Sequence, residues 1–65
     1  MEPQETILQF FRYQHLPAAM QAVSMPFGIL AQQIVDTVPG NPERTVALRK
    51  LLEAKDAAVR ALIFK

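Results

Sequence analysis

The sequence contains no cysteine, and among its 65 residues there are only two glycines and one histidine. Without cysteine, disulfides and thiolate zinc sites are excluded, so stability has to come from packing apolar side chains. A chain of this length buries only about 60% of its unfolded surface, and the balance of buried area against lost entropy comes out near zero. The 51% of hydrophobic residues exceeds what a lone hairpin hides. We therefore expect self-association.

The sequence also lacks an excess of charge of either sign. The net charge is only +1, and 20% of residues are charged. A binder of duplex DNA normally presents a broad basic field, so duplex DNA is an unexpected partner. The sequence suggests no apolar run near the roughly 20 residues of a membrane span. Residues 1–5 are acidic, whereas a signal peptide begins with basic residues. We expect no membrane partner and a cytosolic location.

Catalytic constellations are missing as well. The sequence has no paired acidic cluster, no glycine-rich phosphate loop and no thiol, and His15 is its one histidine. A histidine just before Leu16 and Pro17 serves as a turn residue or contacts a ligand, and a metal site is the less favoured interpretation. These absences predict a binding protein without enzymatic activity, metal or cofactor.

The chain forms one domain with three stretches, and the first is an N-terminal arm, residues 1–16. The arm crowds together five apolar or aromatic residues: Ile7, Leu8, Phe10, Phe11 and Tyr13. Their β-branched and aromatic content favours an extended conformation over a short helix. These aromatics either pack in a core or, beside Arg12 and His15, stack on a nucleobase.

The second stretch, residues 17–38, has the apolar spacing of three and four that is typical of an amphipathic helix. The stripe is Met20, Val23, Phe27, Leu30 and Ile34. Pro26 either kinks this helix or follows a new start capped by Ser24, and we favour one kinked helix. Gly28 costs helix propensity, which predicts that another backbone approaches closely there.

The third stretch, residues 42–63, begins with strong helix-start signals: Asn41 as cap, Pro42 in the first position and Glu43 in the first turn. Its apolar face is Leu48, Leu51, Leu52, Val59, Leu62 and Ile63. The short loop predicts an antiparallel two-helix hairpin of the all-α class. A second stripe, Ala47, Leu51, Ala54 and Ala58, suggests that the second helix also contacts a neighbouring subunit.

The charges of the second helix divide into two groups. Arg49 with Glu53, and Asp56 with Arg60, stand four residues apart and are expected to form surface ion pairs. Arg44 and Thr45 lie in the first helical turn, where free amides and the helix dipole favour an anion, so together they make a candidate phosphate seat.

Several short motifs, in this order and at this spacing, carry a family likeness. They are Tyr13-Gln14-His15-Leu16-Pro17, Leu30-Ala31-Gln32-Gln33-Ile34, Pro39, and Glu43-Arg44-Thr45-Val46-Ala47-Leu48-Arg49-Lys50-Leu51 followed by Glu53-Ala54. From about Arg12 to Ile63 the chain resembles the hairpin domain of phage anti-CBASS and anti-Thoeris sponges.

The resemblance implies a compact homohexamer that sequesters cyclic di- or trinucleotide second messengers in the host cytoplasm without cleaving them. It assigns base stacking to Tyr13, with Phe11 or His15. The family's basic position falls on Ser24, which is uncharged and departs from the pattern. For cyclic trinucleotides it points to Arg44, Thr45 and Arg49.

Two other classes remain open. A structural or adaptor homo-oligomer would bind a protein partner through its helix grooves, with the arm serving only as interface. A small transcriptional regulator would need a more basic surface and a helix-turn-helix, and neither is evident in the sequence.

Overall fold

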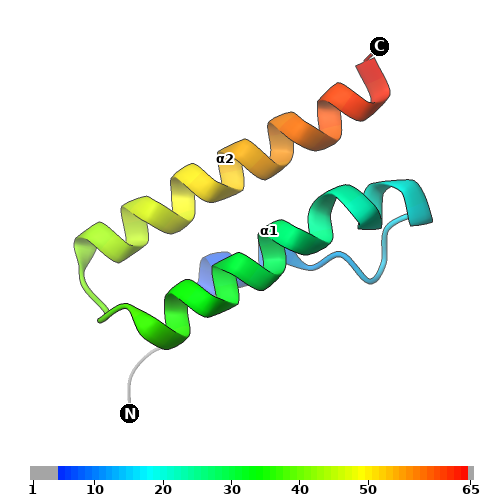
Figure 1. Cartoon of the computed structure of the whole chain (residues 1–65). Helices are drawn as coiled ribbons and strands as arrows, with labels where there is room; N and C mark the ends of the chain where they lie inside the picture. The colour runs from blue at the N-terminus through cyan, green and yellow to red at the C-terminus, as the bar shows by residue number, and fades with distance from the viewer. Residues whose placement is uncertain (1–4, 65) are drawn as a thin grey trace.

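The protein is an antiparallel hairpin of two long helices with a short helix folded against it. The computed structural model describes residues 5–64 and contains a 3-10 helix η1 (Thr6–Phe11), α1 (Ala18–Thr37) and α2 (Pro42–Phe64). No strand occurs within these residues, and α1 and α2 pack against each other (Figure 1). The predicted hairpin is confirmed, and each helix end lies within one residue of its predicted position.

Local hydrogen bonds and prolines explain where α1 ends and where α2 begins. The Asn41 side-chain oxygen accepts a hydrogen bond of 2.9 Å from the Arg44 amide, and Pro42 is the first residue of α2, as predicted. At the end of α1, the Val38 amide donates to the Ile34 carbonyl at 2.9 Å. Val38 itself is extended, which is the conformation favoured before a proline.

Pro26 lies inside an uninterrupted α1, so the alternative of a new start capped by Ser24 is not seen. Proline removes one amide donor, and the carbonyl left without its helical partner belongs to Ala22. Ala22 and Pro26 are both exposed, so water can satisfy that carbonyl. The proline is therefore tolerated because it lies on the outer side of the helix.

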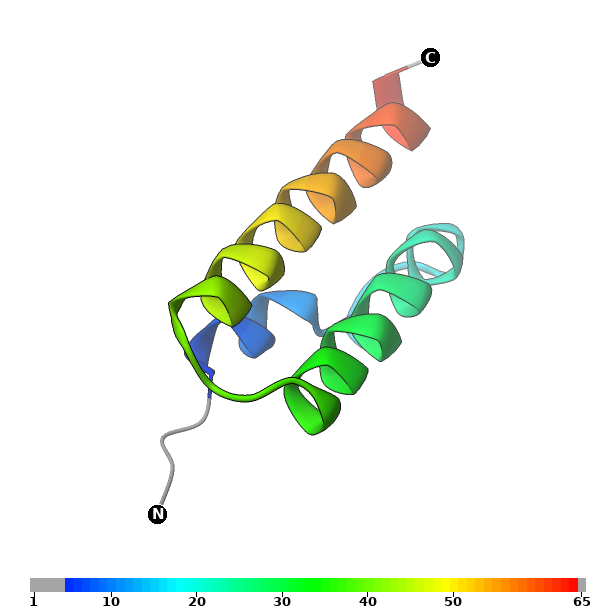
Figure 2. The same ribbon diagram turned by 60° about the vertical axis from the view of Figure 1, so that its left-hand side comes forward.

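The arm is helical from Thr6 to Phe11, which corrects the expectation of an extended segment. Figure 2 shows η1 in the angle between α1 and α2, and it contacts both helices. The intrinsic β preference of its side chains is outweighed by burial of Phe11 against both helices. Residues 1–4 of the predicted arm lie outside the described residues.

The hydrophobic core is small and takes one residue from each element: Phe11, Ala31 and Leu48. Half-buried apolar side chains surround these three: Ile7, Leu8, Phe27, Ile34, Val35, Leu51 and Leu52. Of the predicted stripe on α1, Phe27 and Ile34 pack here, but Leu30 is 44% exposed. The buried side of α1 is rotated toward Ala31 because the helix packs against η1 as well as α2.

By length and composition alone, α1 is long and apolar enough to cross a membrane, contrary to the expectation from the sequence. Its apolar positions are interrupted by uncharged polar residues, so no long run is visible in the sequence. The same helix packs against η1 and α2 in the hairpin. Length and composition therefore do not distinguish a membrane helix from one that packs on protein.

Gly28 is the point where the arm approaches α1 most closely. A Cβ atom at this position would lie 3.0 Å from the backbone oxygen of Phe11 and 3.3 Å from Cδ1 of Tyr13. The predicted close approach of another backbone is thus confirmed, and the approaching segment is the arm. The glycine lowers the helix propensity of α1, but it leaves the space that the arm around Tyr13 occupies.

We expect Gly28→Ala to destabilise the chain by about 1 kcal/mol even though alanine is the better helix former. The helix gains up to about 1 kcal/mol, whereas overpacking costs about 1–3 kcal/mol, and a backbone oxygen has little freedom to move away. Urea unfolding followed by circular dichroism measures the difference. Gln33→Ala, on the exposed side of the same helix, is the control and should change stability by less than about 0.5 kcal/mol. A more stable Gly28→Ala variant would contradict this packing.

Candidate nucleotide site on the arm

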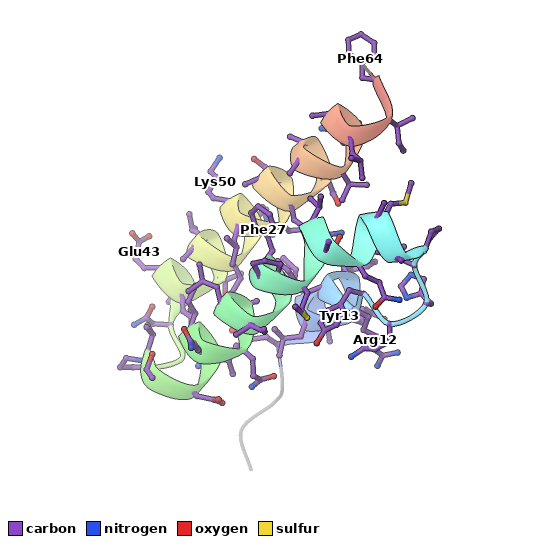
Figure 3. All side chains as sticks on the ribbon, turned by 45° about the vertical axis from the view of Figure 1, so that its right-hand side comes forward. Arg12, Tyr13, Phe27, Glu43, Lys50 and Phe64 are labelled. Carbon is purple, nitrogen blue, oxygen red and sulfur yellow. The ribbon has the colours of Figure 1, made fainter. Side chains whose placement is uncertain are left out.

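A surface hollow lies where the arm crosses α1. Its lining comes from two elements: Leu8, Phe11, Arg12, Tyr13 and Gln14 of the arm, and Gly28 and Gln32 of α1. A neighbouring hollow shares Leu8, Arg12 and Gln32 with it and adds Glu5, Thr6 and Gln9. We call the two together the arm groove. Figure 3 shows Arg12 and Tyr13 close together at this part of the surface.

Arg12 provides the positive charge of the arm groove. Its side chain is exposed, and no carboxylate pairs with it among the ion pairs of residues 5–64. The residue follows η1 directly, and its amide donates to the Gln9 carbonyl at 3.5 Å. Because an arginine presents several donors in a planar fork, this side chain suits an anionic group such as phosphate.

Tyr13 provides the aromatic surface. The residue is half-buried, and its ring lies where a Cβ on Gly28 would come within 3.3 Å. Its amide hydrogen-bonds the side chain of Gln14 at 3.3 Å. Since the glycine leaves room for the ring beside α1, Tyr13 is held in place at the groove. A positioned ring of this kind is what stacking on a nucleobase requires.

Two glutamines supply the arm groove with amide groups that can hydrogen-bond to the edge of a base. Gln32 donates to the Asp36 carboxylate at 3.0 Å, which orients its amide and leaves the amide oxygen as an acceptor. Gln14 lies beside Tyr13 and is exposed. The arm groove therefore combines a cation, an aromatic ring and amides, and sequence reasoning did not select Arg12, Gln14 or Gln32 as site residues. No sequence signal joined Gln32 to the arm, because they meet only through the fold.

Two predicted ligand contacts are buried inside the chain. Phe11 is 3% exposed and belongs to the core, and Ser24 is fully buried. This burial leaves Ser24 no surface for a ligand, and Phe11 reaches the arm groove only with the little surface that it exposes. Phe11 is buried because η1 packs against both α1 and α2, which places its ring in the small core. The Ser24 hydroxyl has no hydrogen-bond partner among the described residues.

Arg44 is also buried, and its donors are already engaged. The guanidinium forms an ion pair of 3.0 Å with Glu5 and donates to the carbonyls of Val38 at 3.0 Å and Val35 at 3.3 Å. Gly40 makes room for it, because a Cβ there would come within 3.0 Å of Nη2. Arg44, at the start of α2, thus links the arm, through Glu5, to the end of α1 and the start of the loop. Because its donors are used in these contacts, the structure does not support the predicted phosphate seat.

The predicted surface ion pairs did not form. Glu53 pairs with Lys50 at 3.9 Å instead of Arg49, and Asp56 pairs with Lys55 at 2.8 Å instead of Arg60. Ion pairs at or near the surface differ by only a few tenths of a kcal/mol, so spacing alone does not determine which of them form. As a result, Arg49 is exposed and not ion-paired among the described residues.

The remaining predicted contacts are His15 and Thr45. His15 is exposed in a turn closed by the Leu16 amide and the Tyr13 carbonyl at 3.0 Å, as its turn interpretation predicted. Thr45 is half-buried, and its amide donates to the Asn41 carbonyl at 3.3 Å. The ligand roles of His15, Thr45 and Arg49 stay predictions. The arm groove contains Tyr13, whereas Thr45 and Arg49 belong to the first half of α2.

Comparisons with models of protein families, with curated proteins and with solved structures found no match for this chain. The likeness to the sponge hairpin is therefore carried by the motifs of this sequence alone.

Proposed function

We propose that the protein is a phage anti-defence sponge that binds cyclic di- or trinucleotide second messengers of CBASS or Thoeris-type immunity and releases them unchanged. Sequestration in the host cytoplasm would deprive the defence effector of its activator. The proposal assigns no catalytic step to any residue, and it treats the assembly as a homo-oligomer, most simply the hexamer implied by the resemblance.

The observation that carries this proposal is the pairing of Arg12 and Tyr13 on the arm groove. The resemblance implies an aromatic of the arm that stacks on a base and a basic residue of the first long helix that meets a phosphate, but this basic position falls on the buried Ser24. Arg12 is adjacent in sequence to Tyr13, exposed, and not ion-paired among the described residues. We infer that Arg12, on the arm, supplies the phosphate contact that a residue of the first long helix makes in the resembled family.

A second set of contacts is proposed on α2 for the larger cyclic trinucleotides. Arg49 and Thr45 remain candidates, while Arg44 acts indirectly by holding the arm and the loop. A single arginine such as Arg49 binds a polyanion weakly. In a symmetric oligomer, however, several copies of Arg49 can converge on a cyclic polyphosphate, and this supports binding by a chain of net charge +1.

Tyr13→Ala and Arg12→Gln test the arm groove directly. We expect each variant to weaken binding of a cyclic dinucleotide at least about 5-fold, since base stacking contributes about 1–3 kcal/mol and a charge-assisted bond about 1.5–3 kcal/mol. Isothermal titration calorimetry with cyclic di- and trinucleotides measures the affinity. Lys50→Gln, the same loss of charge at an exposed position on α2 (Figure 3), is the control and should leave affinity unchanged.

Recovery of intact nucleotide from the denatured complex separates sequestration from hydrolysis. The proposal fails if the wild-type protein retains no cyclic nucleotide of any size in native mass spectrometry. It also fails at the arm groove if the Lys50→Gln control weakens binding as strongly as Arg12→Gln.

The alternative is an adaptor homo-oligomer that binds a protein partner, and one feature favours it. The end of α2 carries an apolar hollow lined by Ala57, Arg60, Ala61, Ile63 and Phe64. Phe64 is 88% exposed there and projects away from the hairpin (Figure 3). Under this alternative, Tyr13→Ala impairs assembly, whereas under the sponge proposal the oligomer stays intact and only ligand binding weakens.

A further inference from the structure

The arm groove has two lobes that meet at Arg12. One lobe lies beside Tyr13 and Gly28 and has a volume of about 170 Å³. The other lies beside Glu5 and is larger, at about 440 Å³. Arg12 and Gln32 line both lobes. A ligand that fills the groove therefore has one end at the tyrosine ring, its middle at the arginine and its other end at the glutamate.

Glu5 has one carboxylate oxygen left for a ligand. Its Oε1 accepts two hydrogen bonds from Arg44, one of 3.2 Å from Nε and one of 3.0 Å from Nη2. A carboxylate oxygen has two lone pairs, so these bonds occupy Oε1. No donor among residues 5–64 is bonded to Oε2, and the side chain is 16% exposed. Arg44 thus holds the carboxylate in place, offsets its charge and leaves Oε2 as an acceptor.

Gln32 supplies a second acceptor to the Glu5 lobe. Its amide nitrogen donates to the Asp36 carboxylate at 3.0 Å, which leaves the amide oxygen for a ligand. Thr6 and Gln9 of η1 line the same lobe and add exposed donors. The Glu5 lobe therefore contains two acceptors, one of them a carboxylate oxygen, with donors close by.

We propose that the Glu5 lobe binds a guanine base of a cyclic dinucleotide, whose N1–H and 2-amino groups donate to Glu5 and Gln32. The inference rests on the proposed function and names the ligand class of its site. Guanine has two adjacent donors on its Watson–Crick edge. Adenine and cytosine have one amino group beside an acceptor, and uracil has one N–H between two carbonyls. A lobe with two acceptors therefore matches guanine best.

A cyclic dinucleotide also has the shape that the two lobes require, because its two bases flank a ring that contains both phosphates. With the phosphates at Arg12, one base stacks on Tyr13 and the other enters the Glu5 lobe. The Glu5 lobe is the larger of the two, which suits a purine. Since Arg44 offsets the charge of Glu5, the carboxylate repels these phosphates less than an unpaired one would.

The resemblance to the sponge hairpin assigns no role to Glu5 or Gln32. It begins at about Arg12, so Glu5 lies outside the part of the chain that it covers. Glu5 and Gln32 line one lobe because the arm packs against α1. The proposed base contact thus follows from the fold of this chain and the hydrogen bonds of these two side chains.

Cyclic dinucleotides that differ only in their bases test the proposal on the wild-type protein. Isothermal titration calorimetry compares three ligands, with two guanines, with one guanine and one adenine, and with two adenines. We expect the two guanine-containing ligands to bind similarly, because the Glu5 lobe needs only one guanine. The ligand with two adenines should bind at least about 5-fold more weakly, since at least one hydrogen bond is lost and an acceptor is left unpaired.

Gln32→Ala and Gln33→Ala are matched variants, because both glutamines are exposed on α1 and only Gln32 lines the groove. The readout is the ratio of the affinities for the diguanine and diadenine ligands. We expect Gln32→Ala to lower this ratio by about 3-fold or more, and Gln33→Ala to leave it unchanged. Glu5→Ala should lower the ratio as well, whereas a loosened arm alone would weaken both ligands by the same factor.

Equal affinities of the wild type for the diguanine and diadenine ligands would overturn this inference and leave the sponge proposal standing. An unchanged ratio in both Gln32→Ala and Glu5→Ala would also overturn it, because these residues would then act only on the structure of the arm. If the wild type binds none of the three ligands, the cyclic-dinucleotide site of the proposed function fails together with the inference.

Discussion

Replacement of Arg44 by methionine is expected to lower the free energy of unfolding by about 3 kcal/mol, because it removes one partner of a buried ion pair. The Arg44 side chain is 7% exposed and that of Glu5 is 16% exposed. The guanidinium also donates to the carbonyls of Val35 and Val38, so the arm, the end of α1 and the loop all lose a contact. A domain of 65 residues has only about 3–10 kcal/mol of stability, so little would remain.

Arg44→Lys distinguishes this role from the phosphate seat. A lysine retains the charge but not the planar fork that reaches Glu5 and both carbonyls, so we expect it also to destabilise the chain, by about 2 kcal/mol. Urea unfolding at fixed protein concentration measures both variants, since assembly makes stability depend on concentration. Glu5→Gln should couple with Arg44→Met in a double-mutant cycle. Full stability of Arg44→Lys would refute the structural role.

Leu48→Ala is expected to cost about 3 kcal/mol, since deleting a fully buried leucine usually costs between about 2.7 and 5 kcal/mol. Leu48 is completely buried, and with Phe11 and Ala31 it forms the buried core of residues 5–64. Because η1, α1 and α2 each supply one member, a cavity here loosens all three elements. Thermal unfolding followed by circular dichroism should show a large fall in the midpoint.

Val46→Ala is the matched control for Leu48→Ala, because Val46 is 47% exposed on the same helix. We expect its effect to stay below about 0.5 kcal/mol. Comparable losses in the two variants would mean that the core lies elsewhere, for example across an interface between copies.

Helix boundaries were predictable because their signals are local. Asn41, Pro42 and the residue before Pro39 act through neighbouring backbone groups, and each was read from the sequence with the correct outcome. Gly28 was predictable as a close approach for the same kind of reason, since a glycine inside a helix needs a compensating contact. The identity of the approaching segment was not predictable, because it lies far along the chain.

The candidate site was predicted only in part. Tyr13 was selected for its ring and lies on the arm groove, but Phe11 has the same chemistry and is buried. Arg44 was selected as a cation at a helix start, yet Glu5, 39 positions away, engages it. Residue type describes what a side chain can bind, and burial decides whether a ligand reaches it.

By itself, the sequence determined an all-helical hairpin, its caps and loop, and a shortage of apolar core, because these follow from periodicity, local hydrogen bonding and composition. Only the tertiary structure decided that the arm is a short helix, that Arg44 is enclosed, and that Arg12 and Tyr13 share a groove with Gln32. It also showed which side of α1 stays exposed. These features depend on contacts between residues far apart in the chain, and a single sequence does not record which of them form.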